Sequence, residues 1–190
     1  MDTIIYQIRI GLEGIKPAVW RRLLVPSDVL VSDLHKIIQT AMGWTNSHLH
    51  QFVKDRTFYE PPAPEDVIFE SSGTDYTGIK LNELLHKKND KIIYEYDFGD
   101  GWEHEIRLEK IIEDDDSGLP VCTAGAMACP PEDCGGIWGF MEFKKIMKNP
   151  EHPEYGEYVE WYGSVYDPKE FDMAAINETL KEDNYGVFEW

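Results

Sequence analysis

The sequence predicts an α+β fold: a mixed, β-grasp-like sheet packed on helices, followed by a mostly helical C-terminal segment. Three observations indicate this class. Apolar residues alternate over 4–12, as in a strand with one buried face, and they recur with helical spacing over 34–41. Two further alternating segments flank a Gly-Asp-Gly turn within 91–112. With the segments between them, these elements follow the order β-β-α-β-α-β-β.

The first two strands and the first helix have clear boundaries in the sequence. We expect strands over residues 4–12 and 18–25, the second of which ends at Pro26. The following helix is expected to begin with Ser32 as its N-cap, because a serine hydroxyl can accept a hydrogen bond from the first turn. Gly43 suits the end of that helix.

The middle of the chain adds a strand, a loop and a short helix. Residues 48–53 are expected to form a third strand, and residues 81–88 a short helix. The prolines within residues 61–66 predict a loop, because proline cannot donate a hydrogen bond to a sheet.

An acidic segment over residues 113–118 is the best candidate for a boundary, since four acids and a glycine rarely pack in a core. It divides the chain into an α+β sheet domain over 1–112 and a helical extension over 119–190. We expect the extension to pack on the sheet domain, so that the two form one structural unit.

Three helices are expected within the extension. The first spans residues 137–148 and the second spans residues 154–163. The third has Asp167 as its N-cap and Pro168 at its first helical position, which is a typical helix start.

Composition argues against several classes of protein. The 190-residue chain has a formal net charge of −18 and lacks the clustered lysines and arginines with which proteins neutralise nucleic-acid phosphates. No apolar run approaches the ~20 residues of a membrane span, and the N-terminus does not resemble a signal peptide. Three cysteines without a secretory signal favour a reducing compartment, and we therefore expect a cytoplasmic protein.

Residues 94–110 are predicted to form a hairpin with many acidic side chains. A two-residue Asp100-Gly101 turn and a three-residue loop over 99–101 are both possible. We favour the three-residue loop because it gathers the apolar side chains on one face. That face would carry Tyr94, Tyr96, Phe98, Trp102, His104, Ile106 and Leu108.

The favoured register places like charges opposite one another on the second face of the hairpin. Asp97 would face Glu103, and Glu95 would face Glu105. Such pairs destabilise a strand pair unless something compensates them. Two interpretations are open: a solvated acidic face, or a face neutralised by a metal ion or by a basic partner.

His48 and His50 form a His-x-His pair on the predicted third strand. Residues two apart on a strand point the same way, so the two imidazoles could share one divalent metal ion such as zinc. His104 or Asp97 would complete the site. Because His104 lies on the apolar face of the hairpin, it is also expected as a core histidine bonded to a tyrosine hydroxyl or a carbonyl.

The most unusual local sequence is CPPEDCGG, residues 129–136. The spacing of Cys129 and Cys134 is not the C-x-x-C spacing of zinc or redox motifs. Free amides at the next helix N-terminus could hold an anion, unless Glu132 and Asp133 occupy them. Three interpretations are open: a rigid helix-entry loop with two buried thiols, a Cys–His metal site, or a nucleophilic Cys134.

Five segments occur in the order of a known family: IKPAVWRRLLVP, LHKIIQTAMGWTNSHLHQF, YEYDFGDGWEHEI, ACPPEDCGGIWGF and DPKEFDMAAINETL. They resemble the plasmid pRi ORF-three-like family, also labelled as TnpR-type passenger proteins of insertion elements. The resemblance implies an association with plasmids or mobile elements and no particular activity, because the family is largely uncharacterised. Its recurring polar positions correspond to His35, His48, His50, Asp97, Asp100, His104, Glu132, Asp133 and Cys134.

Two functions are consistent with these residues, and a third, sequence-specific DNA binding through the C-terminal helices, is open although the net charge opposes it. The first is a non-enzymatic module that binds a protein or peptide partner. The residues expected to face the partner are Trp44, Asp97, Asp100, Trp102, Glu132 and Asp133. The alternative is a metal-dependent hydrolase with the ion on His48 and His50 and with Glu103 as general base, or a nucleophilic Cys134 beside His104. Both require the third strand, the Gly-Asp-Gly turn and the double-proline loop to converge.

Overall fold

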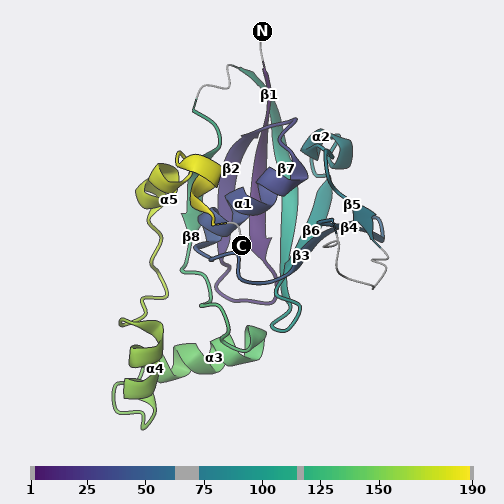
Figure 1. Cartoon of the computed structure of the whole chain (residues 1–190). Helices are drawn as coiled ribbons and strands as arrows, with labels where there is room; N and C mark the ends of the chain where they lie inside the picture. Colours follow the sequence, from purple (N-terminus) through teal and green to yellow (C-terminus); the bar gives the residue numbers. More distant parts are fainter. Residues whose placement is uncertain (1–2, 63–72, 115–117, 189–190) are drawn as a thin grey trace.

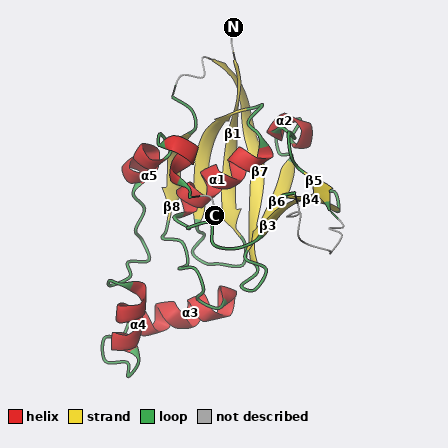
Figure 2. Ribbon diagram, in the orientation of Figure 1, coloured by secondary structure: helices red, strands yellow, loops and turns green. Residues whose placement is uncertain are grey.

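The computed structural model describes residues 3–62, 73–114 and 118–188, and it confirms the α+β class (Figures 1 and 2). One eight-stranded sheet has the order β5-β4-β3-β6-β7-β1-β2-β8. The described strands are β1 Thr3–Leu12, β2 Trp20–Pro26, β3 His50–Lys54, β4 Thr57–Glu60, β5 Thr74–Asp75, β6 Lys91–Tyr96, β7 Trp102–Asp114 and β8 Val121–Ala126. Neighbouring strands are antiparallel, apart from the parallel pair β4 and β5.

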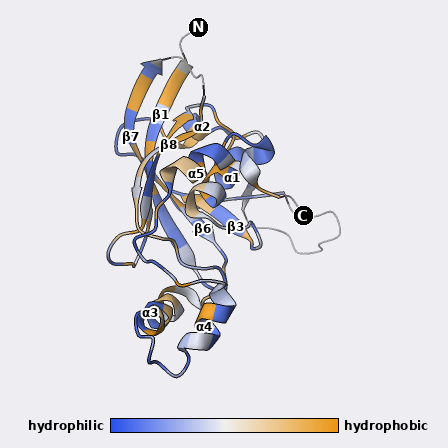
Figure 3. Ribbon diagram, turned by 90° about the vertical axis from the view of Figure 1, so that its left-hand side faces the viewer, coloured by the Kyte–Doolittle hydropathy of each residue, from blue (hydrophilic) through white to orange (hydrophobic). Residues whose placement is uncertain are grey.

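Helices cover one face of the sheet and extend beyond one of its ends (Figures 1 and 3). The described helices are α1 Val31–Met42, α2 Leu81–Leu84, α3 Gly136–Met147, α4 Tyr155–Tyr162, α5 Met173–Thr179 and the short 3-10 helix η1 Asp183–Gly186. Helix α1 crosses the face with α5 beside it, whereas α3 and α4 pack together beyond the end of the sheet. Within the described residues, no helix is long and apolar enough to cross a membrane.

The core forms between the sheet and α1, because each presents one apolar surface to the other. Ile8 and Ile10 of β1 are fully buried, and so are Leu34 and Ile37 of α1. The alternation and the helical spacing predicted for these segments are therefore confirmed. Gly43 ends α1 as predicted, with a left-handed φ of 83° that glycine adopts without strain.

Two predicted helix starts are wrong. Leu30 rather than Ser32 is the N-cap of α1, and it makes no side-chain cap hydrogen bond. Helix α5 begins after Asp172, whose carboxylate caps its first turn. Asp167 instead accepts a hydrogen bond two residues on, in a local turn that competes with helix formation.

Several boundaries also differ from the prediction. The third strand begins at His50 and not at residue 48, and the short helix predicted over 81–88 ends at Leu84. Of the loop predicted over 61–66, residues 63–66 lie outside the described residues.

The predicted boundary and the segment after it contain strand residues. Strand β7 continues to Asp114, inside the acidic segment 113–118, of which residues 115–117 lie outside the described residues. Strand β8 lies within the segment 119–190 that we expected to be helical, and it pairs with β2. The C-terminal part of the chain therefore completes the sheet before it forms helices.

The β6–β7 hairpin has a longer loop than either predicted form. Tyr96 pairs with Trp102 and Tyr94 pairs with His104, which leaves a five-residue loop over 97–101. This register is shifted by two residues from the favoured one, so the same face stays apolar. Phe98 is the exception, because it lies in the loop with 53% of its surface exposed.

The acidic face of the hairpin is a solvated outer face of the sheet. Glu95 and Glu103 are directly opposite each other, rather than the pairs that we expected. The amide of Gln51 donates to Glu95, and the neighbouring Glu105 pairs with Lys91 at 2.5 Å. Neighbouring donors therefore offset the repulsion on this face without a metal ion.

Candidate metal centre

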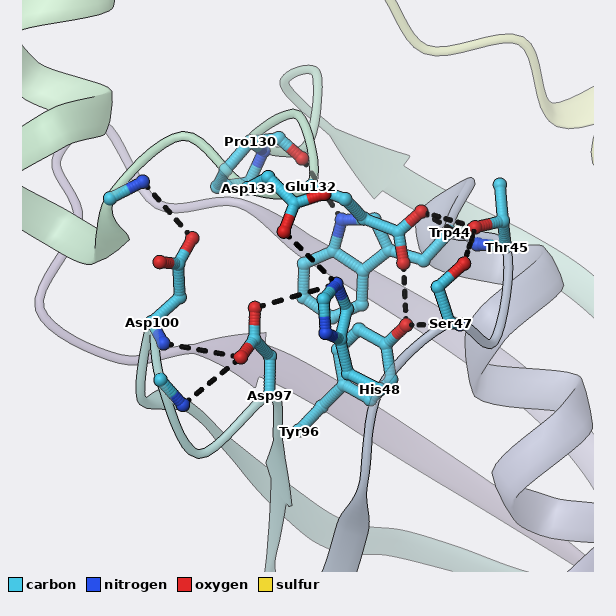
Figure 4. Close-up of polar contacts among 12 residues, drawn as sticks. Trp44, Thr45, Ser47, His48, Tyr96, Asp97, Asp100, Pro130, Glu132 and Asp133 are labelled. Atoms are coloured by element: carbon cyan, nitrogen blue, oxygen red, sulfur yellow. Dashed lines mark hydrogen bonds and ion pairs between the residues drawn. The ribbon is translucent and has the colours of Figure 1, made fainter.

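Three loops meet at the end of the sheet that faces α3 (Figure 4). They are residues 44–49 after α1, residues 97–101 of the hairpin and residues 129–135 before α3. The indole N–H of Trp44 donates to the carbonyl of Pro130 at 2.9 Å, which ties the first loop to the third. The structure therefore joins the three segments whose convergence the sequence analysis required.

Backbone contacts complete the junction. The amide of Asp97 donates to the carbonyl of Leu49 at 2.9 Å. The first residue of the hairpin loop is therefore bonded to the loop after α1 and not to β7. The amide of Gly135 donates to the carboxylate of Asp100 at 3.1 Å. The amide at the start of α3 therefore donates to Asp100, and not to Glu132 or Asp133. The carboxylate of Asp100 takes the place that an external anion was expected to fill.

The centre of this junction is formed by His48, Asp97 and Asp133 (Figure 4). The Nε2 atom of His48 lies 3.7 Å from Oδ2 of Asp97 and 3.4 Å from Oδ1 of Asp133. The three potential ligand atoms all lie within 4.8 Å of one another. Nε2 of His48 is buried and has no hydrogen-bond partner among the described residues.

The hairpin loop orients Asp97 toward His48. Oδ1 of Asp97 accepts the amides of Gly99 at 3.0 Å and of Asp100 at 3.2 Å, which leaves Oδ2 to face the imidazole. Asp97 has a left-handed φ of 55°, and Asp133 has a left-handed φ of 59°. Aspartate tolerates this region better than most residues, and such backbone conformations concentrate at functional sites.

Glu132 fixes the distance between the loops that carry His48 and Asp133. Its carboxylate accepts the hydroxyl of Tyr96 at 2.5 Å and the hydroxyl of Thr45 at 2.6 Å. Burial and the charge of Glu132 raise the pKa of Tyr96, so the phenol remains a donor to that carboxylate. The network therefore supports the central group from one side.

Glycine is required where the hairpin loop reaches α3. A Cβ atom at position 136 would lie 2.4 Å from the carbonyl oxygen of Asp100, and Gly136 has a φ of 65°. The Gly-Gly pair in CPPEDCGG therefore permits the close approach of Asp100 to the start of the helix.

The spacing of the central group fits a divalent metal ion. Metal–ligand bonds of ~2.0–2.2 Å to imidazole and carboxylate place neighbouring ligand atoms ~3.0–3.6 Å apart. The side chain of Asp133 is 72% exposed, so a small rotation could close the carboxylate–carboxylate edge. One imidazole and two carboxylates suit zinc, manganese or iron.

The predicted pairing of His48 with His50 is wrong. His48 precedes β3, so the two residues do not alternate along a strand. The ring of His50 stacks on His35 with centroids 3.5 Å apart, and its Nε2 lies 2.8 Å from the hydroxyl of Tyr76. Burial lowers the pKa of His50 to about 2. His50 thus belongs to a buried polar cluster and not to the metal group.

His104 is a core histidine, as one of the two interpretations predicted. Its Nδ1 lies 3.2 Å from the carbonyl oxygen of Tyr94, and its ring contacts the edge of Trp44 with centroids 5.1 Å apart. Burial lowers the pKa of His104 to about 4. His104 therefore lies in the core, outside the metal group, and is neither a candidate metal ligand nor a candidate catalytic residue.

The two tryptophans expected to face a partner are part of the core. Trp44 is 6% exposed and Trp102 is 1% exposed, and their rings pack 6.2 Å apart. Side chains so deeply buried cannot be anchors for a partner. Their role is to hold the site loops against the sheet.

Neither Glu103 nor Cys134 suits the catalytic role expected of it. Glu103 lies on the outer face of the sheet opposite Glu95. Burial, together with the charge of Asp100, raises the pKa of the Cys134 thiol to about 12, which opposes formation of the nucleophilic thiolate. The other thiol of the motif, Cys129, lies 3.2 Å from Nη2 of Arg21.

The contact of Asp133 with His48 was not predicted from the sequence. Asp133 was expected to bind a partner, and the metal ligands were expected on the third strand and on the hairpin, as His48 and His50 with His104 or Asp97. A signal was present, since Asp97 and Asp133 both occur in short glycine-containing loops, where aspartate adopts positive φ.

Comparison with known proteins gives a family and two relatives without a described function. The model of a family described as plasmid pRiA4b ORF-3-like protein matches residues 4–175. The uncharacterized protein y4hQ of Sinorhizobium fredii is 36% identical over 179 residues, which cover 93% of this chain and 88% of the relative. A crystal structure of the protein of unknown function MM3350 from Methanosarcina mazei Go1 has a TM-score of 0.78 and 36% identity. It covers 91% of this chain and 97% of its own.

Proposed function

This chain belongs to the plasmid pRiA4b ORF-3-like protein family, and we propose that it binds one divalent metal ion through His48, Asp97 and Asp133. The described relatives are uncharacterised, so the proposal rests on the site. The observation that carries it is the buried Nε2 of His48, which faces two carboxylates without a hydrogen bond.

A histidine cation paired with the two carboxylates fits these contacts less well. Charge-assisted N–H···O bonds are ~2.7–2.9 Å long, whereas the two contacts of His48 measure 3.4 and 3.7 Å. The contact with Asp133 lies within the ~3.0–3.6 Å that separates neighbouring ligand atoms of one ion, and the contact with Asp97 lies just above it. A metal ion would also partner the orphaned nitrogen atom.

The charges of the three ligands, and the hydrogen bonds that hold Asp97 in place, support the same assignment. Asp97 is held by two amides at its other oxygen atom, which is the arrangement that orients metal-binding carboxylates. Two carboxylates and a neutral imidazole would compensate the charge of a divalent ion. Three protein ligands leave coordination positions for water or for a ligand.

The proposal stops at metal binding and does not extend to hydrolysis. A hydrolase needs a general base within reach of a metal-bound water. Among the described residues at the junction, the carboxylate of Glu132 accepts hydrogen bonds from Tyr96 and Thr45, and that of Asp100 accepts one from Gly135. Glu103, the base that we first expected, lies on the other side of the sheet.

Calorimetry with the purified full chain tests the proposal. After removal of metal with EDTA, we expect Zn²⁺ or Mn²⁺ to bind with about one ion per chain and to raise the melting temperature. The changes His48→Ala, Asp97→Asn and Asp133→Asn should each weaken binding by roughly tenfold or more.

His86→Ala is the matched control, because His86 is an exposed histidine outside the junction. It should bind the ion like the unchanged chain. Binding that survives all three ligand changes, or that is absent at ~100 μM ion, would contradict the proposal.

A further inference from the structure

A cavity of about 300 Å³ lies between residues 133–134, which precede α3, and α4. Its lining residues are Asp133, Cys134, Glu157, Tyr158 and Trp161. Its volume is at the lower end of the range for ligand pockets and suits one long side chain rather than a large cofactor.

Two aromatic rings form a corner of this cavity. The rings of Tyr158 and Trp161 have centroids 6.3 Å apart and planes 71° apart. Phe143 of α3 is fully buried, and its ring contacts both of them, with centroid distances of 6.0 and 5.8 Å. The corner is therefore anchored to the core before any ligand binds, although Trp161 itself is 49% exposed.

The charged groups of the lining are all acidic. Asp133 and Glu157 contribute carboxylates, and no lysine or arginine is among the described lining residues. Glu157 makes no ion pair with a described residue, and Lys145 of α3 is paired with Glu142. Asp133 also contacts His48, at 3.4 Å. Aromatic faces next to carboxylates attract organic cations, because ring quadrupoles and carboxylate charges act in the same direction.

We propose that this cavity binds the guanidinium or ammonium group of a basic side chain presented by a peptide. The aromatic corner would contact the cationic head and its alkyl stem, and Glu157 and Asp133 would accept its N–H groups. The net charge of −18 would favour the approach of such a peptide. This site shares Asp133 with the proposed metal centre but needs no metal ion.

Ligand-observed NMR on the EDTA-treated full chain tests the proposal independently of metal binding. The probes are a blocked Gly-Arg-Gly tripeptide, its citrulline counterpart, which has the same shape without the charge, and free agmatine. We expect the arginine tripeptide to bind at least about tenfold more tightly than the citrulline tripeptide, with an affinity that falls as salt is added. Tighter binding of the tripeptide than of agmatine would support a peptide as the source of the cation.

Matched variants identify the site. Trp161→Ala and Glu157→Gln should each weaken binding of the arginine tripeptide by about fivefold or more. Trp138→Ala and Glu160→Gln remove an exposed indole and an exposed carboxylate outside the lining, and they should leave binding unchanged.

Three results would overturn the proposal: equal binding of the two tripeptides, unchanged binding in both lining variants, or tighter binding of agmatine than of the arginine tripeptide. Because all titrations use metal-free protein, none of them depends on whether the metal proposal holds.

Discussion

The imidazole rings of His35 and His50 stack face to face, with centroids 3.5 Å apart and planes 2° apart. Each ring also has a neutral hydrogen-bond partner, since His35 contacts the hydroxyl of Tyr94 and His50 contacts that of Tyr76. Two stacked rings cannot both carry a charge in a buried site without strong repulsion. Burial accordingly lowers the pKa of His35 to about 4 and that of His50 to about 2.

This stack predicts a loss of stability in mild acid. A histidine in the unfolded chain binds a proton below pH ~6.5, while these two remain neutral in the folded chain, so the unfolding free energy falls as pH decreases through that value. We expect a loss of about 1.6 kcal/mol for each of these histidines between pH 6.5 and 5. Urea titrations at several pH values measure it.

The change His50→Gln removes one of the titrating groups and provides the comparison. Its unfolding free energy should depend less steeply on pH, because about one proton fewer is taken up on unfolding. This difference in slope is independent of the absolute stability of the variant. A pH dependence equal to that of the unchanged chain would show that His50 is not buried in its neutral form.

Glu132 is predicted to position the metal ligands. Glu132→Ala removes the acceptor that joins Tyr96 and Thr45, so the loop that carries His48 should loosen. We expect ion affinity to fall by roughly tenfold, as it does when groups behind metal ligands are removed. Calorimetry with Zn²⁺ measures the change, and Glu103→Gln on the outer face of the sheet should have no effect on it.

Gly136 is predicted to be essential for the close contact between the hairpin loop and α3. Gly136→Ala would place a Cβ atom 2.4 Å from the carbonyl oxygen of Asp100, at a φ of 65°. We expect a loss of about 1–3 kcal/mol in unfolding free energy, measured by urea denaturation, and weaker ion binding.

Gly156→Ala is the matched control for that change. Gly156 lies in α4, and a Cβ atom there would have no neighbour within 4 Å. Alanine should leave stability unchanged or raise it by about 0.5–1 kcal/mol, because it favours the helix. Equal effects of the two substitutions would contradict the packing argument.

Adjacent arginines of β2 are predicted to differ in importance. Arg21 is 3% exposed, donates to the carbonyl oxygens of Ala41, Trp20 and Ala126, and stacks on a phenyl ring. Arg22 lies on the outer face and makes a partly exposed, bidentate ion pair with Glu109. Arg21→Ala should cost about 3 kcal/mol or more, because it leaves buried carbonyls unpaired.

The same substitution at the neighbouring position should have a smaller effect. Arg22→Ala should cost about 1–2 kcal/mol, less than Arg21→Ala, because it breaks a partly exposed ion pair but leaves no buried carbonyl unpaired. Thermal unfolding of both variants measures the difference, and a larger loss from Arg22→Ala would contradict the burial assigned to these side chains.

Patterns between near neighbours in the chain were sufficient for much of the fold. The alternation of β1 and the spacing of α1 predicted their buried faces, since Ile8 and Leu34 lie in the core. The aromatic face of the β6–β7 hairpin was also predicted, although its register was wrong by two residues. A shift of two preserves which side chains share a face, and hydrophobic alternation cannot detect it.

The hairpin loop shows where local patterns are insufficient. Asp97 leaves the ladder because its amide bonds to Leu49 and its side chain caps the following amides. The first of these contacts joins a different part of the chain, so turn statistics for the Gly-Asp-Gly segment favoured a shorter loop.

The candidate site was predicted in its location but not in its composition. Both candidate functions required the His48 segment, the hairpin turn and the CPPEDCGG loop to converge, and the three segments do meet. The sequence did not indicate that His50 would turn into the core toward His35, or that Trp44 would be buried. The direction of His50 follows from its pairing with Tyr96 across β3 and β6, and the burial of Trp44 follows from contacts between loops such as its hydrogen bond to Pro130.

The sequence by itself determined the class of fold, the buried faces of its main strands and first helix, and the three segments that carry the acidic and histidine side chains. Only the tertiary structure decided that His48, Asp97 and Asp133 form one group, and that Asp133 also lines an aromatic cavity. The reason is physical: periodicity reports contacts within an element, whereas a site among three loops depends on backbone contacts between distant segments.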